Sequence, residues 1–301
     1  MMKHFRGVLT GRFGLAFRTG ITGWVFVSFA TIMIFWTSFY PMIAGFILSL
    51  QTGVGANMTF AGFSNYARLI EDPVFWTVIG NTFLYLLVQV PIMLVLALIL
   101  ASLLNRPNLK FKGLFRTCIF LPSATALVSY SIIFRGLFAT DGYINYILMN
   151  MGFMDAPFNW LGTAWSARLV IILALLWRWT GFNMIFYLAA LQNMDKNVYE
   201  AAKIDGAGAF SVFTRITIPM LKPIILLTAI MSTTGTMQLF DESMNLTGGG
   251  PARQSMTISH YIFTVAFQGS PNFGYAATLS YVIFVIVALL AVIQLKVGDR
   301  R

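Results

Sequence analysis

Residues Tyr199–Pro223 read YEAAKIDGAGAFSVFTRITIPMLKP and separate two apolar stretches that are each long enough to cross a membrane. Good helix formers without a breaker fill Tyr199–Ile204, which predicts a short helix. Gly206 and Gly208 then end or bend that helix, and Pro219 opens the next apolar helix. A polar loop of this size between membrane spans is typical of a surface that binds a partner.

The composition is that of a polytopic membrane protein. Of the 301 residues, 58% are hydrophobic and 10% are charged, whereas a soluble domain carries roughly 25% charged residues. The stretches between charges predict six transmembrane helices, each near or above the ~20 residues that a bilayer requires. Residues 254–268 are more polar, so they predict a helix at the membrane edge rather than a seventh span. The six predicted spans cover about 23–50, 77–104, 116–138, 168–191, 218–240 and 275–295.

The basic residues predict the orientation of these spans. Fifteen of the 20 Lys and Arg residues fall on one side of the six-span arrangement, and cytoplasmic loops carry such an excess. Both termini and the Tyr199–Pro223 loop are therefore expected in the cytoplasm. The net charge of +10 follows from this topology, so we expect no nucleic-acid partner. The fifteen residues are Lys3, Arg6, Arg12, Arg18, Arg106, Lys110, Lys112, Arg116, Lys196, Lys203, Arg215, Lys222, Lys296, Arg300 and Arg301.

The chain lacks the residue patterns of common enzymes. It has no G-x-x-x-x-G-K-[ST] sequence to hold the phosphates of ATP. Its two histidines, His4 and His260, are far apart in sequence, and Cys118 is its single cysteine. We therefore expect no catalytic triad, no metal site and no cofactor, and ATP hydrolysis, where it is needed, has to come from another subunit.

The polar loop carries a resemblance to a known family. Its pattern is E-A-A, three residues, G, nine residues, I-x-L-P, with Ile218 in place of the leucine. This pattern resembles the cytoplasmic signature of permease subunits of ATP-binding-cassette (ABC) importers. The flanking sequences Trp177–Met184 (WRWTGFNM) and Leu246–Pro251 (LTGGGP) are similar to the carbohydrate-uptake branch, which includes maltose- and lactose-type permeases.

The resemblance implies the type I ABC importer permease fold, an all-α membrane protein of six transmembrane helices. A cytoplasmic tail, 1–21, would precede a permease domain, 22–301, whose core is about 77–296. The chain would be the transmembrane subunit of an ATP-driven sugar importer in the bacterial inner membrane, forming half of the translocation pathway. The implied partners are a second, related permease, two copies of a cytoplasmic ABC ATPase and an extracytoplasmic solute-binding protein, which Leu246–Pro251 would face.

By the same resemblance, loop 195–222 couples the permease to the ATPase by docking a short helix in a cleft of that subunit. Small side chains on the helix let a partner surface approach closely, and charges at its rim contribute to specificity. An acidic residue near a helix N-terminus also has an ordinary electrostatic explanation, which applies to Glu200 taken alone. The predicted coupling residues are Glu200, Ala201, Ala202, Asp205 and Gly206.

Spans four and five carry the candidate substrate path. Arg178 lies near the middle of span four, where a charge requires a partner, and we expect that partner to be Asp241 or Glu242. Trp177 and Trp179 lie on different faces of their helix, so only one faces the pathway. Alternative explanations are a buried ion pair and helix packing. By resemblance, the substrate-path residues are Trp177, Arg178, Phe182, Met231, Gly235, Gln238 and Asp241.

Two other functions remain open from sequence. The same class of importer could carry a polyol or a glycerol phosphate in place of a sugar. A different class would be a six-span channel or membrane enzyme that acts without an ATPase.

Overall fold

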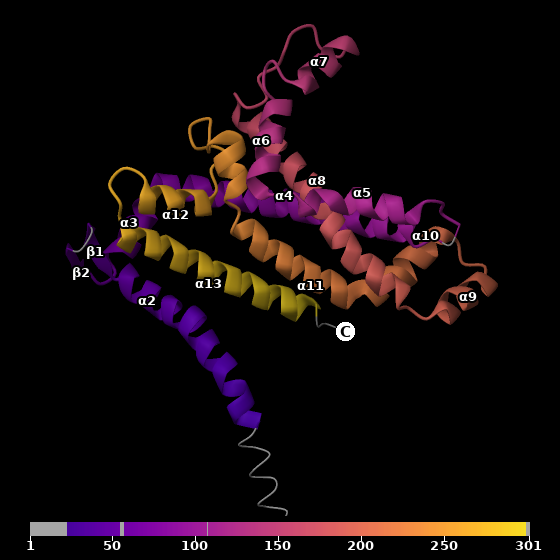
Figure 1. The fold of residues 1–301 in the computed structure, drawn as a ribbon, viewed down its shortest axis with the longest axis horizontal. Coiled ribbons are helices and arrows are strands. Elements are labelled where there is room, and N and C mark those ends of the chain that lie inside the picture. The colour runs from indigo at the N-terminus through magenta and orange to yellow at the C-terminus, as the bar shows by residue number, and fades with distance from the viewer. Residues whose placement is uncertain (1–22, 55–56, 107, 299–301) are drawn as a thin grey trace, which may run out of the picture.

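The computed structural model describes residues 23–54, 57–106 and 108–298, which form an elongated helical bundle (Figure 1). Five helices in this part of the chain are long and apolar enough to cross a membrane, and they agree with five of the six predicted spans. The predicted tail, 1–21, lies outside the described residues. The five helices are Gly23–Ser49, which includes η1 (Phe35–Phe39) and α2 (Tyr40–Ser49), α4 (Pro73–Leu104), α8 (Ala164–Gln192), Ala209–Met237 and α13 (Phe273–Gly298).

The third predicted span, 116–138, is wrong as a continuous helix. It consists of α5 (Lys112–Ala124) and α6 (Leu127–Leu137), whose axes are bent by 99°. Pro122 lies in the last turn of α5 and has no N–H to continue the helical ladder. The next residues are extended, with ψ of 149° at Thr125. The two helices together are long and apolar enough to count as one membrane span, but the chain changes direction halfway along it.

The polar loop is more helical than the sequence predicts. The short helix α9 (Lys196–Ile204) begins three residues before the predicted Tyr199 and ends where expected. The following helix already begins at Ala209, well before Pro219, through α10 (Ala209–Val212), η2 (Phe213–Thr217) and α11 (Ile218–Met237). Pro219 is accommodated because it sits in the first turn of α11, directly after the π-helical turn η2.

A small hairpin joins the first helix to the rest of the bundle, an element that the sequence analysis did not predict. Strands β1 (Gln51–Val54) and β2 (Asn57–Phe60) are antiparallel, and α3 (Ser64–Glu71) follows them. Asn65 Nδ2 donates to the carbonyl oxygens of Ser49 and Gln51, at 3.0 and 2.8 Å. These bonds fix the end of the first helix beside α3, and the Thr278 hydroxyl of α13 also donates to the Ser49 carbonyl at 3.1 Å.

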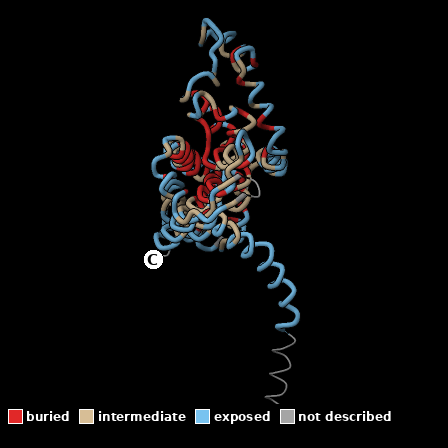
Figure 2. Tube along the Cα trace, turned by 90° about the vertical axis from the view of Figure 1, so that its left-hand side faces the viewer, coloured by how far each residue is buried: buried red, intermediate tan, exposed pale blue. Residues whose placement is uncertain are grey.

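Three short helices complete the chain: α7 (Tyr143–Asn150), η3 (Ser243–Thr247) and α12 (Ile258–Phe267). With 10 residues, α12 is too short to span a bilayer, which agrees with the predicted absence of a seventh span. Residues around α7 project from the side of the bundle (Figure 1). Buried residues gather in the centre of the bundle, while the described part of the first helix is exposed along most of its length (Figure 2).

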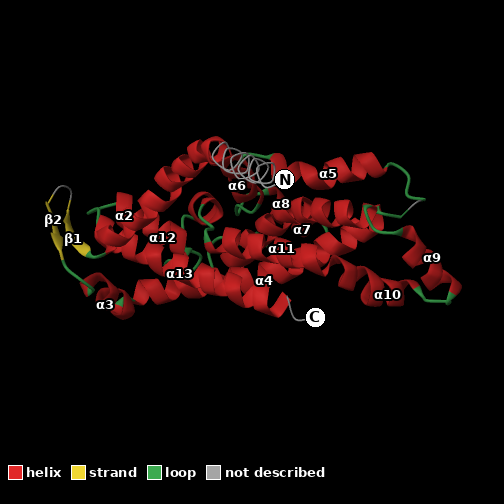
Figure 3. Ribbon diagram, turned by 90° about the horizontal axis from the view of Figure 1, so that it is seen from below, coloured by secondary structure: helices red, strands yellow, loops and turns green. Residues whose placement is uncertain are grey.

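The two ends of the bundle differ in structure. The hairpin and α3 lie at one end, and α9 and α10 lie at the other (Figures 1 and 3). The start of α5 also lies at the α9 end (Figure 1). The two basic loops of the described chain, around residues 105–116 and 193–222, therefore share one end of the molecule.

Helices α5 and α8 approach closely at Gly181, so the stability of the protein should be sensitive to a larger side chain at this position. A Cβ atom on Gly181 would lie 1.9 Å from the carbonyl oxygen of Ile119. We expect Gly181→Ala to destabilise the protein by about 1–3 kcal/mol, because the backbone of α5 has to shift. The midpoint of thermal unfolding in detergent measures this.

Gly80→Ala on α4 is the matched control, since nothing lies within 4 Å of the added Cβ there. It should leave the midpoint unchanged or raise it slightly, because alanine favours a helix over glycine. Equal midpoints for the two variants would show that α5 and α8 do not approach closely in solution.

Candidate functional site

A cavity of about 350 Å³ lies between α4, α8, α11 and the segment that follows α11. Eight of its lining residues are polar or acidic, and four are aromatic. The mixture of flat aromatic faces with amide and hydroxyl groups suits a small polar ligand that also has apolar surface. The polar residues are Gln89, Asn183, Thr228, Ser232, Thr236, Gln238, Asp241 and Glu242, and the aromatic ones are Trp179, Phe182, Phe186 and Phe240.

Helical periodicity brings these side chains to one place. Five residues of α8 line the cavity at spacings of three and four, which puts them on one face of that helix. The residues of α11 repeat the same spacing over Thr228, Met231, Ser232 and Gly235. The chain leaves α11 at Gln238 and is non-helical as far as Phe240, and Asp241 and Glu242 begin the next helical segment, which leads into η3. This stretch closes one end of the cavity. The five residues of α8 are Leu175, Trp179, Phe182, Asn183 and Phe186.

Five of the seven predicted substrate-path residues line this cavity: Phe182, Met231, Gly235, Gln238 and Asp241. Trp177 and Arg178 do not. Trp177 is 46% exposed, and its ring centre lies 5.4 Å from that of Phe134 on α6, while Trp179 lines the cavity instead. Contact of these residues with substrate stays a prediction.

Arg178 holds the break between α5 and α6. One of its guanidinium nitrogens donates to the carbonyl oxygen of Thr125 at 2.6 Å and to the Thr125 hydroxyl at 3.1 Å. The expected partners, Asp241 and Glu242, form no hydrogen bond or ion pair with Arg178 among the described residues. The reason is geometric: the break frees a backbone carbonyl beside α8, and the guanidinium donates to it.

Glu242 belongs to the same buried cluster through Tyr130. The Arg178 guanidinium carbon lies 4.8 Å from the centre of the Tyr130 ring, and the Tyr130 hydroxyl donates a hydrogen bond to Glu242 Oε1. Glu242 is 2% exposed. Burial raises the pKa of its carboxyl, while the Tyr130 hydrogen bond and the nearby Arg178 charge oppose that rise. Three elements, α6, α8 and the turn after α11, thus meet around one carboxyl group.

The predicted substrate path leaves out nine of the twelve polar or aromatic residues of the cavity, among them Gln89, Trp179, Asn183 and Glu242. Gln89 had a usable signal, since it interrupts an otherwise apolar stretch at membrane depth. Asn183 and Trp179 had the helical spacing to Phe182 and Phe186. The sequence analysis predicts Glu242 as an ion-pair partner of Arg178. Its place at the cavity depends on the path of the chain after α11, which helical periodicity does not predict.

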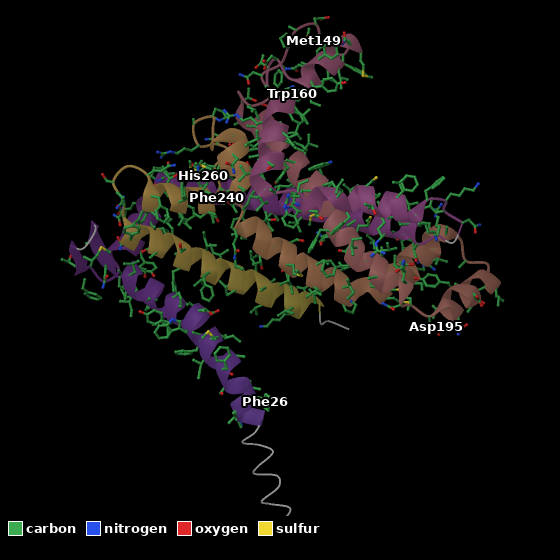
Figure 4. All side chains as sticks on the ribbon, in the orientation of Figure 1. Phe26, Met149, Trp160, Asp195, Phe240 and His260 are labelled. Carbon is green, nitrogen blue, oxygen red and sulfur yellow. The ribbon has the colours of Figure 1, made fainter. Side chains whose placement is uncertain are left out.

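The Gly-rich turn at Leu246–Pro251 is tied to the bundle. Gly248 and Gly249 have positive φ values of 61° and 77°, which glycine adopts without strain. Just beyond the turn, Asn81 Nδ2 donates to the carbonyls of Arg253 and Met256 at 3.0 and 2.9 Å. The same region contains Phe240 and His260, whose rings meet edge to face (Figure 4).

At the opposite end, α9 is a well-terminated helix, which we call the docking helix (Lys196–Ile204). Asp195 caps its start by accepting a hydrogen bond from the Asn197 N–H at 2.9 Å. Gly206 has φ of 71°, and the Ala207 N–H donates to the Ala202 carbonyl at 2.9 Å. This is the left-handed glycine end of a Schellman turn.

The docking helix presents its predicted coupling residues to the outside. Glu200, Ala201, Asp205 and Gly206 are exposed, and Ala202 is buried. Glu200 lies in the second turn, so a role in the helix N-terminus does not explain it. Two large apolar residues nearby are also open to solvent, Ile204 at 86% and Phe210 at 80%. An exposed apolar cluster rimmed by charge is typical of a protein-binding surface; Figure 4 shows Asp195 at this end of the molecule.

Comparison with known proteins gives consistent results. Residues 93–297 match the family described as "Binding-protein-dependent transport system inner membrane component". The lactose transport system permease protein LacF of Rhizobium radiobacter is 49% identical over 97% of this chain and 99% of its own. The arabinooligosaccharides permease AraP of Halalkalibacterium halodurans is 34% identical, over 87% of this chain and 85% of its own.

A solved structure has the same fold. A chain of a bacterial ABC transporter involved in the import of the acidic polysaccharide alginate superposes with a TM-score of 0.83, covering 96% of this chain and 99% of that one. The two sequences are 21% identical, so the likeness concerns the fold alone. The predicted fold class is therefore correct.

Proposed function

Because the chain belongs to the family of inner membrane components of binding-protein-dependent transport systems, we propose that it is the transmembrane subunit of an ATP-driven sugar importer. The main support for this proposal is that the cavity and the docking helix are joined by the same helices. The two helices that supply most of the cavity wall, α8 and α11, are also the two that flank the docking helix. The names of the relatives, which include lactose and arabinooligosaccharide permeases, support a sugar as the cargo.

The cavity has the chemistry for a sugar. The apolar C–H faces of a sugar ring stack on aromatic side chains such as Trp179 and Phe182. Its hydroxyl groups hydrogen-bond to amides and carboxylates, which Gln89, Asn183 and Gln238 provide. In this proposal the chain forms half of the translocation pathway, and Phe182, Met231, Gly235, Gln238 and Asp241 contact the sugar directly.

Arg178 and Trp177 belong to the path indirectly in this proposal. Arg178 fixes the break between α5 and α6, and Trp177 packs against Phe134 beyond that break. Their substitution would act on the shape of the cavity rather than on a contact with sugar.

Coupling to ATP hydrolysis follows from the docking helix. Only Asn193, Met194 and Asp195 separate α8 from this helix, and the helix that becomes α11 begins at Ala209. A shift of the docking helix is therefore passed to both walls of the cavity along rigid helices. The exposed Ala201, Ile204 and Phe210 make it a surface for a cytoplasmic ABC ATPase, two copies of which serve the importer.

The remaining partners are a second, related permease and an extracytoplasmic solute-binding protein. The family description and the need for two halves around one path support them. The chain itself performs transport and no catalysis, since ATP hydrolysis resides in the ATPase subunit. Residues 22–301 act as a single permease domain.

We assign both termini and the docking helix to the cytoplasm of the bacterial inner membrane. The two basic loops of the described chain lie at the docking-helix end, as the positive-inside rule requires. A reporter fused after Arg301 should behave as cytoplasmic. A reporter that is active only outside the membrane would contradict this orientation.

Gly206→Pro is expected to abolish sugar uptake and the stimulation of ATPase activity while the protein remains in the membrane. Proline fixes φ near −65°, whereas Gly206 has φ of 71°, so the turn that ends the docking helix cannot form. Uptake and ATPase activity in proteoliposomes measure the effect.

Gly208→Pro is the control for this substitution, because Gly208 already has φ of −67°. It should retain most of the uptake. Normal uptake by Gly206→Pro would mean that the docking helix does not transmit the closure of the ATPase.

Gln238→Leu is expected to weaken transport without preventing assembly. Leucine keeps roughly the size of glutamine but removes the amide that faces the cavity. We expect uptake per assembled complex to fall by about tenfold at limiting sugar, the loss of one or two hydrogen bonds to a polar ligand.

Gln192→Leu gives the same chemical change on the exposed end of α8, outside the cavity. It should leave uptake per complex unchanged. If Gln238→Leu also matched the wild-type titration curve, Gln238 would be a packing residue and the sugar path would lie elsewhere.

A further inference from the structure

The charged groups of the cavity are all of one sign. Among the described residues, Asp241 and Glu242 line it, and no Lys, Arg or His does. Arg178 and Arg168 form no hydrogen bond or ion pair with either carboxylate among the described residues, and the charge of Arg178 acts on Glu242 only from outside the cavity. Arg178 donates to Thr125, and Arg168 donates to Asn81 Oδ1 at 2.7 Å and to Gln254 at 2.7 and 2.8 Å.

Glu242 is held in place from behind. The Tyr130 hydroxyl donates to one carboxyl oxygen, and the ring of Tyr130 is held under the Arg178 guanidinium. The neighbouring Ser243 is fully buried, and its hydroxyl accepts from the Thr257 N–H at 3.2 Å, so the backbone beside Glu242 is anchored too. A carboxyl group fixed in this way cannot turn away from a ligand that repels it.

We propose that Glu242, with Asp241 beside it, makes the cavity selective for neutral saccharides and excludes saccharides that carry a carboxylate. The inference rests on the proposed function and specifies its substrate class. A carboxylate accepts hydrogen bonds from sugar hydroxyls, so it favours a neutral sugar. It repels a second carboxylate, and Asp241 beside it adds to the repulsion, because no cation lines the described part of the cavity.

The role of Glu242 is thus one of specificity and not of coupling. Its substitution should change which sugars bind, while the docking helix and the ATPase remain unaffected. Glu242 lies at the end of α11 that is remote from the docking helix, which separates the two effects in space.

The test measures sugar binding to the assembled complex in lipid nanodiscs, with ATP bound to a hydrolysis-deficient ATPase subunit and no solute-binding protein present. Leaving out the binding protein removes its own selectivity. The two probes are lactose and its galacturonosyl counterpart, in which the C6 alcohol of the galactose ring is a carboxylate. Their dissociation constants are compared as a ratio.

Wild type should bind lactose at least about tenfold more tightly than the acidic sugar, and Glu242→Gln should reduce this ratio below about threefold. Asp241→Asn should also reduce this ratio, and it replaces Glu242→Gln in the test if the Glu242→Gln complex does not assemble. Glu71→Gln, at the exposed end of α3, makes the same chemical change outside the cavity and should keep the wild-type ratio.

Two results would overturn the inference alone: equal binding of both sugars to wild type, or a tenfold ratio retained by Glu242→Gln and Asp241→Asn. Failure of wild type to bind either sugar would contradict the proposed function, and the inference with it.

Discussion

A transmembrane helix that breaks partway along its length leaves backbone carbonyls that need a donor, and Arg178 supplies it. Its guanidinium donates to the carbonyl of Thr125 and lies over the ring of Tyr130, so one side chain of α8 fixes both sides of the break. An unpaired backbone group at this depth costs several kcal/mol, and so does an unpaired charge. The Thr125 carbonyl gains a donor and one guanidinium nitrogen of Arg178 gains acceptors, while Arg178 Nε stays buried without a partner among the described residues.

The cavity depends on this arrangement. The bend of 99° carries α6 away from the axis of α5 and puts Tyr130 against Glu242. The close approach of α5 and α8 at Gly181 leaves the face with Trp179 and Phe182 open towards α11. A straight third span would instead pass alongside α8 and leave Glu242 without a donor. The same two helices, α8 and α11, are connected along the chain to the docking helix.

Features with a local cause were predictable from the sequence. Five spans follow from length and hydropathy, and the docking helix follows from its helix formers and from Gly206, whose positive φ ends it. Of the five predicted substrate-path residues at the cavity, Phe182, Met231 and Gly235 meet there because of helical spacing on two neighbouring helices, whereas Gln238 and Asp241 reach it beyond the end of α11. Features that depend on contacts between distant segments were not predictable. The sequence pairs Arg178 with an acidic residue, because charge alone does not reveal that a freed carbonyl lies closer. It also selects Trp177 over Trp179, because the rotation of α8 about its axis is set by packing.

The central claim, that Arg178 holds the break, is tested most directly by measuring the bend itself. Cys118 on α5 is the single cysteine and is exposed, and Ile133 on α6 is also exposed, so Ile133→Cys gives two sites for spin labels. In a straight helix the two backbone positions would be about 22 Å apart, and the bend brings them closer. We expect a short, narrow distance distribution in the otherwise wild-type protein, little change with Arg178→Lys, which keeps a donor for the Thr125 carbonyl, and a longer or broader distribution with Arg178→Met. An unchanged distribution in Arg178→Met would show that the break is held by other contacts and would contradict the account.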